Sequence, residues 1–236
     1  MSTLIAIETS TESCSAALMR DGDIIERSEL APRRHAELIL PMIESLLAEA
    51  GLSRRQIDAV AVGRGPGAFT GVRLAISVAQ GIGLGLDIPV ITISSLAALA
   101  QDVPADIDAP ILAVIDARMG EVYSGAFRRN SDGTVEPLTA ESVGPASMIV
   151  IPKVANAKNG QWAIIGSGWS AYQDAVSARL SALPIWSDGA RYPQARAVAR
   201  LAAPQLALGQ GMAADFALPV YLRDKVALTL DEQRAR

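Results

Sequence analysis

The sequence contains little cysteine, little histidine and few aromatic residues. Its 236 residues include a single cysteine, Cys14, and a single histidine, His35. One cysteine cannot form an internal disulfide, which fits a reducing cytoplasm, and one histidine leaves an ordinary zinc or iron site without partners. Ser-His-Asp or Cys-His catalysis would have to depend on His35 alone. These absences weigh against a disulfide-stabilised protein, a metalloenzyme and a nucleophilic hydrolase.

The sequence also lacks a surplus of positive charge. It has 21 Lys and Arg against 25 Asp and Glu, a net charge of −4. This balance argues against a protein that binds nucleic acid alone, and the basic pairs Arg33–Arg34 and Arg128–Arg129 are interpreted as solvated surface. The N-terminus has no basic signal-peptide region, and we expect no apolar run to reach the length needed to span a bilayer. We therefore expect a cytoplasmic globular protein without membrane contact.

Strand and helix patterns alternate along the chain. Half of the residues are apolar, enough to fill a large core. Two strands joined by a hairpin turn at Asp21–Asp23 are expected after an apolar first strand. The elements expected next are a helix over 34–50, a strand over 59–62, a helix from about 70 to before Pro89, and a strand over 90–95. This order is typical of an α/β fold with crossover connections.

A weak internal repeat divides the chain. The segment 111–118, ILAVIDAR, echoes 4–11, LIAIETST, because each is an apolar strand with a carboxylate near its end. The Pro- and Asp-rich segment 103–110 is a plausible boundary. We predict an N-terminal subdomain over 1–102 and a C-terminal one over 103–236, whose last helix could pack back on the first. The charged tail is expected to be frayed.

A glycine-rich loop precedes the second helix pattern. The segment 63–73, GRGPGAFTGVR, could present backbone N–H groups to a phosphate or allow close protein packing. It lacks the P-loop spacing and the G-x-G-x-x-G pattern. Gly81 and Gly85 share a helix face with Ser77 although glycine disfavours helix interiors. Close packing is therefore favoured over ligand contact for these helical glycines.

Two carboxylates occupy equivalent places in the repeat. Glu8 and Asp116 each follow an apolar strand and precede a short turn. In α/β proteins functional groups lie at such strand ends. The two side chains could face each other across a cleft and hold a metal–nucleotide, or each could cap its own turn. Taken alone, the pattern favours capping.

Four segments together resemble a known family. AIETST near the N-terminus, GPGAFTGVRLAISVAQGIGLGLDIPV, IDARMGEVY and the late PVYLR closely resemble the TsaB family of the bacterial tRNA threonylcarbamoyladenosine (t6A37) pathway. The resemblance covers nearly the whole chain and is weakest over 131–159. It implies an α/β, actin-like and sugar-kinase-like (ASKHA) fold with two related subdomains, each with a mixed sheet flanked by helices.

The resemblance also implies a role without catalysis. The catalytic paralogue, TsaD, holds a metal through a His-x-x-x-His pair, whereas this chain has His35 and then Ile39, which cannot ligate a metal. The family resemblance implies a non-catalytic scaffold that heterodimerises with TsaD through its first two helices and works with the ATPase TsaE. The wide apolar stripe of the first helix and the small-residue face of the second indicate the partner surface, for which we expect Leu38, Met42, Val72, Ile76, Gln80, Gly81 and Gly85.

The nucleotide loops of the superfamily are degenerate in this chain. The first phosphate loop normally carries an aspartate followed shortly by glycine, and the matching positions here are Glu8, Thr9, Ser10 and Thr11, with Asp116 and Arg118 in the second half. We therefore expect no catalytic residue, no metal ligand and no cofactor of its own. ATP or ADP, metal and tRNA are expected only in the complex, and a homodimer when alone. The alternative is a stand-alone ATP-dependent kinase or glycoprotease-like peptidase of the same fold.

Overall fold

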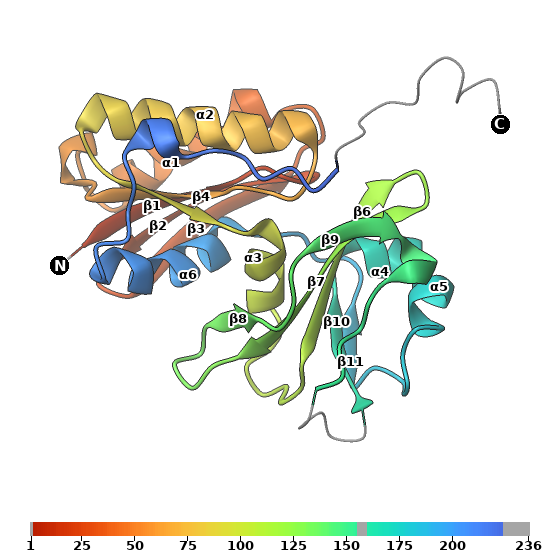
Figure 1. The fold of residues 1–236 in the computed structure, drawn as a ribbon. Helices are drawn as coiled ribbons and strands as arrows, with labels where there is room; N and C mark the ends of the chain where they lie inside the picture. The colour runs from red at the N-terminus through yellow and green to blue at the C-terminus, as the bar shows by residue number, and fades with distance from the viewer. Residues whose placement is uncertain (1, 155–159, 224–236) are drawn as a thin grey trace, which may run out of the picture.

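The protein consists of two lobes, each built on one β-sheet (Figure 1). The structure is a computed structural model that describes residues 2–154 and 160–223. The first lobe contains the N-terminal strands and the two longest helices, and the second contains the strands after residue 110. The expected charged tail lies largely outside the described residues.

The sheet of the first lobe has five strands in the order β3-β2-β1-β4-β5. β1, β2 and β3 are antiparallel neighbours, whereas β1, β4 and β5 run parallel, so the sheet is mixed. The tight turn between β2 and β3 has Asp21 and Gly22 in the left-handed region, as the Asp-Gly pair predicts. The strand bounds are Thr3–Glu8, Ser13–Arg20, Asp23–Leu30, Ala59–Gly63 and Val90–Ile93.

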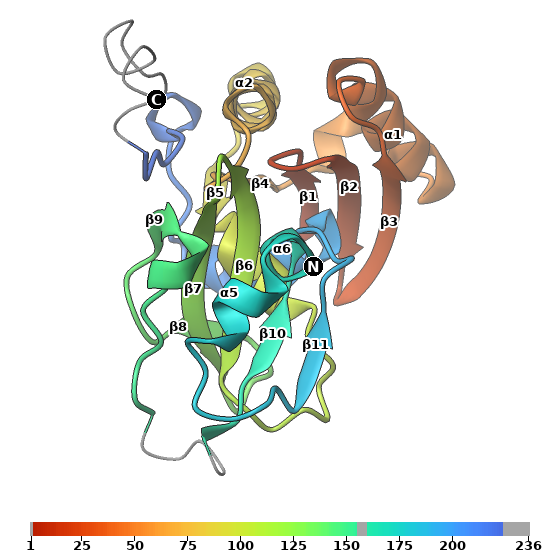
Figure 2. The same ribbon diagram turned by 90° about the vertical axis from the view of Figure 1, so that its right-hand side faces the viewer.

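Helices cover both faces of this sheet, which explains why β1 is apolar throughout. Ile5 and Ile7 point to a core shared with helices α1 (His35–Glu49) and α2 (Phe69–Leu86). Leu4 and Ala6 point to the opposite face, where they meet helix α6 (Ala195–Ala207). Figure 2 shows α1 and α2 on the side of this sheet that faces away from the second lobe. The turn η1 (Arg54–Gln56) connects α1 to β4.

Helix α2 meets the length and composition of a membrane span. Among the described residues it is the one helix that is long and apolar enough to cross a membrane. The expectation that no segment reaches that length was therefore wrong. The inner side of α2, including Ala75 and Ala79, is buried in the core of the first lobe. This helix thus contributes apolar residues to a globular core.

The second sheet repeats the topology of the first. Its strands lie in the order β11-β10-β6-β7-β8, with β9 also paired to β7. β6, β7 and β8 are antiparallel neighbours and β6, β10 and β11 are parallel, as in the first lobe. The predicted α/β fold with two related mixed sheets flanked by helices is confirmed. The remaining bounds are β6 Ile111–Arg118, β7 Glu121–Arg129, β8 Val135–Pro137, β9 Ser142–Pro145, η2 Ala146–Met148, β10 Ala163–Ile165, α4 Ser167–Ala171, α5 Gln173–Ser177 and β11 Trp186–Asp188.

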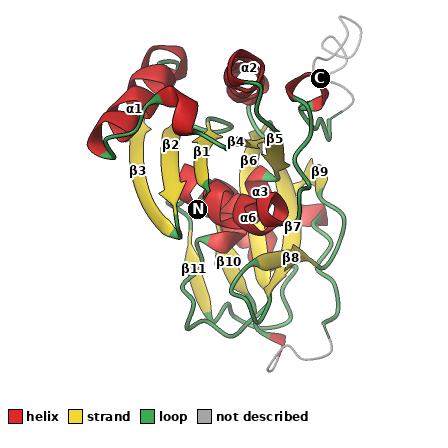
Figure 3. Ribbon diagram, turned by 90° about the vertical axis from the view of Figure 1, so that its left-hand side faces the viewer, coloured by secondary structure: helices red, strands yellow, loops and turns green. Residues whose placement is uncertain are grey.

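Two helices lie between the sheets, and each packs on the sheet of the other lobe (Figure 3). α3 (Ser95–Gln101) follows β5 in sequence but packs on β6, β7 and β8 of the second sheet. α6 follows β11 but packs on β1, β2, β4 and β5 of the first sheet. The two helices also contact each other, so one hydrophobic core runs through both lobes.

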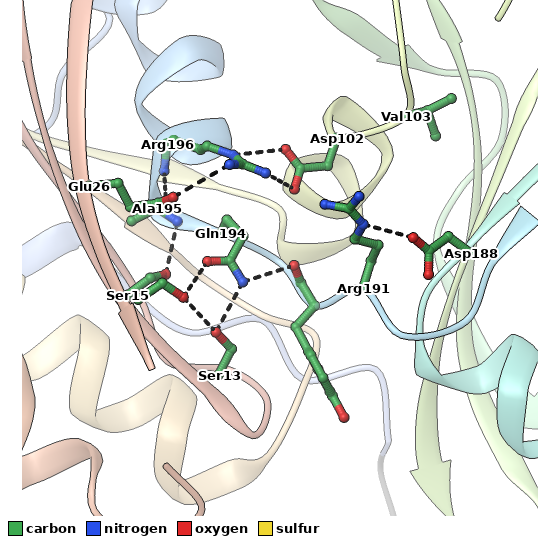
Figure 4. Close-up of polar contacts among 12 residues, drawn as sticks. Ser13, Ser15, Glu26, Asp102, Val103, Asp188, Arg191, Gln194, Ala195 and Arg196 are labelled. Atoms are coloured by element: carbon green, nitrogen blue, oxygen red, sulfur yellow. Dashed lines mark hydrogen bonds and ion pairs between the residues drawn. The ribbon is translucent and has the colours of Figure 1, made fainter. Parts of the chain in front are cut away.

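Polar contacts fix the start of α6 on the first sheet (Figure 4). The backbone N–H of Ala195 donates to Ser15 Oγ at 2.9 Å, and that of Arg196 donates to Glu26 Oε1 at 2.9 Å. The Arg196 guanidinium donates to both oxygens of Asp102, the C-cap of α3, at 2.9 and 3.2 Å. The two backbone bonds supply partners for N–H groups that the first helical turn leaves free, and the guanidinium bonds tie α6 to the end of α3.

The chain after α6 runs beside α2. Met212 bridges Val90 at the edge strand, and the short helix η4 (Ala214–Phe216) packs on α2. The backbone N–H of Val220 then donates to the carbonyl of Arg64 at 2.9 Å. This C-terminal segment reaches the end of β4, next to the glycine-rich loop.

Candidate functional site

A cleft of about 550 Å³ opens where the ends of β1, β4 and β6 approach one another. It is lined by the β1–β2 turn, the starts of α1 and α2, the end of β6 and the C-terminal segment. The carboxyl ends of parallel strands are where α/β proteins bind ligands. This cleft is therefore the candidate site, and among the residues predicted from sequence it includes Ser10, Thr11, Val72, Asp116 and Arg118.

The glycine-rich loop packs on the β1–β2 turn of the same chain. A Cβ at Gly63 would overlap the Glu8 carboxylate, and a Cβ at Gly71 would overlap the carbonyl oxygen of Thr9. Gly67 approaches the backbone of Ser10 in the same way. The sequence left a phosphate and another piece of protein as the two candidates for this approach. The structure shows that these three glycines accommodate the protein's own first turn.

Glu8 is buried beneath this loop. Its side chain accepts hydrogen bonds from the Ser10 backbone N–H at 2.6 Å and from Ser95 Oγ at 2.8 Å. Burial raises the pKa of the Glu8 carboxyl, and the bonds from Ser10 and Ser95 lower it in part. The side chain is 0% exposed and does not line the cleft. Glu8 is therefore placed to cap the turn rather than to meet a ligand.

Asp116 lies at the cleft and also caps its own turn. The Arg118 backbone N–H donates to Asp116 Oδ1 at 2.7 Å, and the Arg118 guanidinium donates to Oδ2 at 3.0 Å. Tyr172 Oη donates to Oδ1 at 3.1 Å. Each carboxylate of the repeat thus accepts a bond from the backbone two residues on. The geometry matches the capping alternative, and Glu8 and Asp116 do not face each other across the cleft.

Other side chains of the degenerate loops bond within the protein. Thr9 Oγ1 donates to the carbonyl of Gly71 at 2.7 Å, and His35 Nε2 lies 2.9 Å from the carbonyl oxygen of Thr11. The Arg118 guanidinium also pairs with Glu12 across the cleft, so it joins the β6–β7 turn to the β1–β2 turn. Within residues 2–154 and 160–223, no three His, Cys, Asp or Glu side chains gather as a metal site would require.

An aromatic group at the cleft was not predicted. The Arg73 guanidinium lies 3.6 Å from the ring centre of Phe69 and 5.4 Å from that of Tyr221. The two rings stack with centres 5.7 Å apart, and Arg73 Nε donates to Tyr221 Oη at 2.5 Å. The late PVYLR segment was noted as a motif but given no role. Its position beside α2 follows only from the fold.

The residues of the predicted partner surface do not all lie on one exposed face. Gly81 and Gly85 face outward beside Ser77, and a Cβ at either glycine would meet no atom within 4 Å. Val72 and Ile76 were expected on the same surface, but they are 2% and 4% exposed in the core of the first lobe. Their inclusion was wrong, because they lie on the inner side of α2.

The remaining members of that predicted surface are half-buried. Leu38 and Met42, both on α1, lie at the edge of the core. Gln80 donates through Nε2 to the carbonyl of Ala217 in the C-terminal segment at 3.0 Å. The outward face of α2 is therefore the part of the prediction that remains available to a partner.

Replacing Glu8 by glutamine tests whether burial favours the uncharged form of its carboxyl group. The folded-state pKa of Glu8 is raised, so its contribution to stability is full below the unfolded pKa of about 4.3 and is lost as pH rises through the folded value. Glutamine does not ionise in this range, so Glu8→Gln removes this loss of stability at higher pH. In urea unfolding from pH 5 to pH 8, the variant should gain stability relative to the original protein as pH rises. The exposed Glu44→Gln, which loses a surface pair with Arg54, should show no such trend, and a parallel pH dependence for Glu8→Gln would contradict the assignment.

Three features define an actin-like, sugar-kinase-like protein of two lobes: the repeated mixed sheets, the two helices that each pack on the sheet of the other lobe, and the cleft at the strand ends between the lobes. The family model of TsaD, tRNA N6-adenosine threonylcarbamoyltransferase, matches residues 26–229. The chain belongs to the TsaB family within this group, since similar proteins of that name cover it almost entirely.

Two relatives and two solved structures illustrate the match. The tRNA threonylcarbamoyladenosine biosynthesis protein TsaB of Escherichia coli is 38% identical over 95% of this chain and 96% of its own length. TsaB of Haemophilus influenzae is also 38% identical, over 95% and 94%. A crystal structure of a Pseudomonas aeruginosa protein described as similar to the peptidase YeaZ has a TM-score of 0.85 and 42% identity, and it covers 94% of this chain and all of its own. A second structure, YeaZ of the same organism, has a TM-score of 0.84 and 42% identity.

Proposed function

We propose that the protein is a non-catalytic scaffold subunit in the formation of t6A37 in tRNA. The proposal follows from its membership of the TsaB family, whose relatives are named tRNA threonylcarbamoyladenosine biosynthesis proteins. In this function it pairs with a TsaD-type catalytic paralogue and works with a TsaE-type ATPase. It operates in the cytoplasm.

One observation carries the non-catalytic part of the proposal. The loop that would hold a phosphate in a nucleotide-binding relative is filled here by the protein itself. Glu8 is turned beneath Gly63 and bonded to Ser10 and Ser95, so its carboxylate is not offered to a metal–nucleotide. A buried carboxyl with a raised pKa is also a poor ligand for a cation, because ligation requires the ionised form.

The outward face of α2 supports the pairing. Small residues on a helix let a second helix approach closely, and such a surface is retained although glycine lowers helix stability. Gly81, Gly85 and Ser77 provide it, and the exposed Leu84 adds apolar area beside them. The partner of this face is a TsaD-type protein in the complex and a second copy of this chain when it is alone.

Nucleotide, metal and tRNA belong to the complex in this proposal. The cleft could contribute Arg118 and Asp116 to a nucleotide held jointly with a partner, but both side chains already bond within the protein. The net charge of −4 gives little electrostatic reason for tRNA affinity by the protein alone. The alternative, a stand-alone kinase or peptidase of the same fold, would need catalytic groups for which we find no arrangement at the cleft among the described residues.

The purified protein alone is therefore expected neither to hydrolyse ATP nor to cleave peptides. Release of phosphate from ATP with Mg²⁺, and cleavage of a casein substrate, measure the two activities. Asp116→Asn is the informative variant, since Asp116 is the carboxylate that lines the cleft. Turnover that persists through repurification and is lost in Asp116→Asn would support the kinase or peptidase alternative instead.

A further inference from the structure

A second cavity, of about 670 Å³, lies away from the cleft. It is bounded by the end of α3, the β7–β8 hairpin and α6, which are the elements that join the two lobes. Three guanidinium groups line it, those of Arg129, Arg196 and Arg200. We call it the arginine cavity. The lining also contains two carboxylates, those of Asp102 and Asp132.

One of the three arginines is already neutralised. Arg196 pairs with Asp102 through two hydrogen bonds and lies 3.8 Å from Glu26 (Figure 4). The remaining acidic group of the lining, Asp132, is held within the hairpin. Its Oδ1 accepts from the Thr134 backbone N–H at 2.9 Å and from Thr134 Oγ1 at 2.7 Å. Neither carboxylate forms an ion pair with Arg129 or Arg200 among the described residues.

Arg129 is turned into the protein and incompletely bonded. Its Nη1 donates to the carbonyl of Gly133 at 2.8 Å and its Nη2 to the carbonyl of Val103 at 2.6 Å. Its Nε is buried and has no hydrogen-bond partner in the described part of the chain. Burial, and then the positive charge of Arg200, lower the pKa of Arg129. The buried Nε leaves this side chain with an unsatisfied donor, which costs free energy. Each Nη atom carries a second N–H besides the one bonded to a carbonyl, and Arg129 lines the cavity, so its guanidinium can donate to an anion there.

Arg200 supplies the second cation. It projects from α6 as an exposed residue, and within residues 2–154 and 160–223 it forms no ion pair. Its positive charge helps to lower the pKa of Arg129, and it also opposes the rise that burial causes in the pKa of Glu26. Arg200 therefore lies near one other cation and one carboxylate. Guanidinium groups bond phosphate in a planar, two-point manner, so a phosphate is a suitable ligand for such a pair.

We propose that the arginine cavity binds a phosphate group between Arg129 and Arg200. Two neighbouring cations match a group of charge near −2 better than a single carboxylate. The volume exceeds that of a bare ion, so the phosphate can carry a further substituent. It comes from a small phosphorylated molecule or from the backbone of RNA. This inference does not depend on the proposed scaffold function.

Calorimetric titration of the full chain with pyrophosphate at low, constant ionic strength tests the proposal, with sodium acetate as the control anion. Pyrophosphate should bind and raise the melting temperature, whereas acetate should do neither. Arg200→Gln should weaken pyrophosphate binding about tenfold or more, and Arg200→Glu should abolish it. Both variants should fold, because Arg200 is exposed and forms no ion pair with the described residues. Arg128→Gln is the matched control: its guanidinium lies next in sequence but pairs with Glu136 on the surface.

Unmodified tRNA then identifies the source of the phosphate. If it displaces pyrophosphate from the original protein, the cavity takes the RNA backbone. If it does not, the ligand is a small phosphorylated molecule, and the proposal holds in either case. Binding that is equal for pyrophosphate and acetate, or unchanged in Arg200→Gln, would overturn it.

Discussion

Gly71→Ala is expected to lower the free energy of unfolding by about 3 kcal/mol, near the upper end of the usual cost of overpacking. The added methyl group would overlap the carbonyl oxygen of Thr9, and this is backbone that cannot rotate away. Thr9 Oγ1 also donates to the carbonyl oxygen of Gly71, which holds the two segments together. The β1–β2 turn and the first turn of α2 would therefore have to separate.

Gly81→Ala is the matched control, because it makes the same change in the same helix. Its Cβ meets no atom within 4 Å, so the substitution should raise stability by about 0.5–1 kcal/mol through helix propensity. Urea unfolding of the two variants measures the difference. If both variants change stability equally and in the same direction, the glycine loop does not pack on the first turn as described.

Gly81→Leu is expected to abolish pairing with a TsaD-type partner while the fold remains intact. A leucine at this position fills the space that a partner helix needs for close approach, and a large side chain forces helices apart. In this chain the same leucine points into open space, so its own stability should be preserved. Co-elution on size-exclusion chromatography measures the pairing, and thermal unfolding checks the fold.

Ala207→Leu controls for an added surface leucine. Ala207 is exposed on α6, on a different helix from the proposed partner face. This variant should pair as the original protein does. Normal pairing of Gly81→Leu would show that the outward face of α2 is not the partner surface. This result would not depend on the function of the complex.

Local sequence signals predicted the elements well. The Asp-Gly pair at 21–22 determined the hairpin because both residues must adopt positive φ, and they do. The helix expected from about residue 70 to before Pro89 is α2, Phe69–Leu86. The echo between 4–11 and 111–118 reflects two sheets of the same topology. These features depend on neighbouring residues, so one sequence is enough to find them.

Long-range packing was less accessible from sequence. Whether Val72 and Ile76 face a partner or the core depends on which side of α2 meets β4, and the apolar pattern of a nearly all-apolar helix does not specify that side. The exchange of α3 and α6 between the sheets has no local signal. Arg128 and Arg129 were interpreted as one solvated pair, yet alternation along β7 turns Arg129 inward.

Reconstituted t6A synthesis tests the scaffold account most directly. The reaction contains unmodified tRNA, threonylcarbamoyl-adenylate, ATP, and TsaD-type and TsaE-type proteins, and the product is t6A measured after nuclease digestion. We expect t6A to accumulate when this protein is added, to fall to background when it is omitted or replaced by Gly81→Leu, and to be absent when it is the sole ASKHA subunit. Synthesis by this protein without the TsaD-type subunit, or synthesis at an equal rate without this protein, would contradict the account.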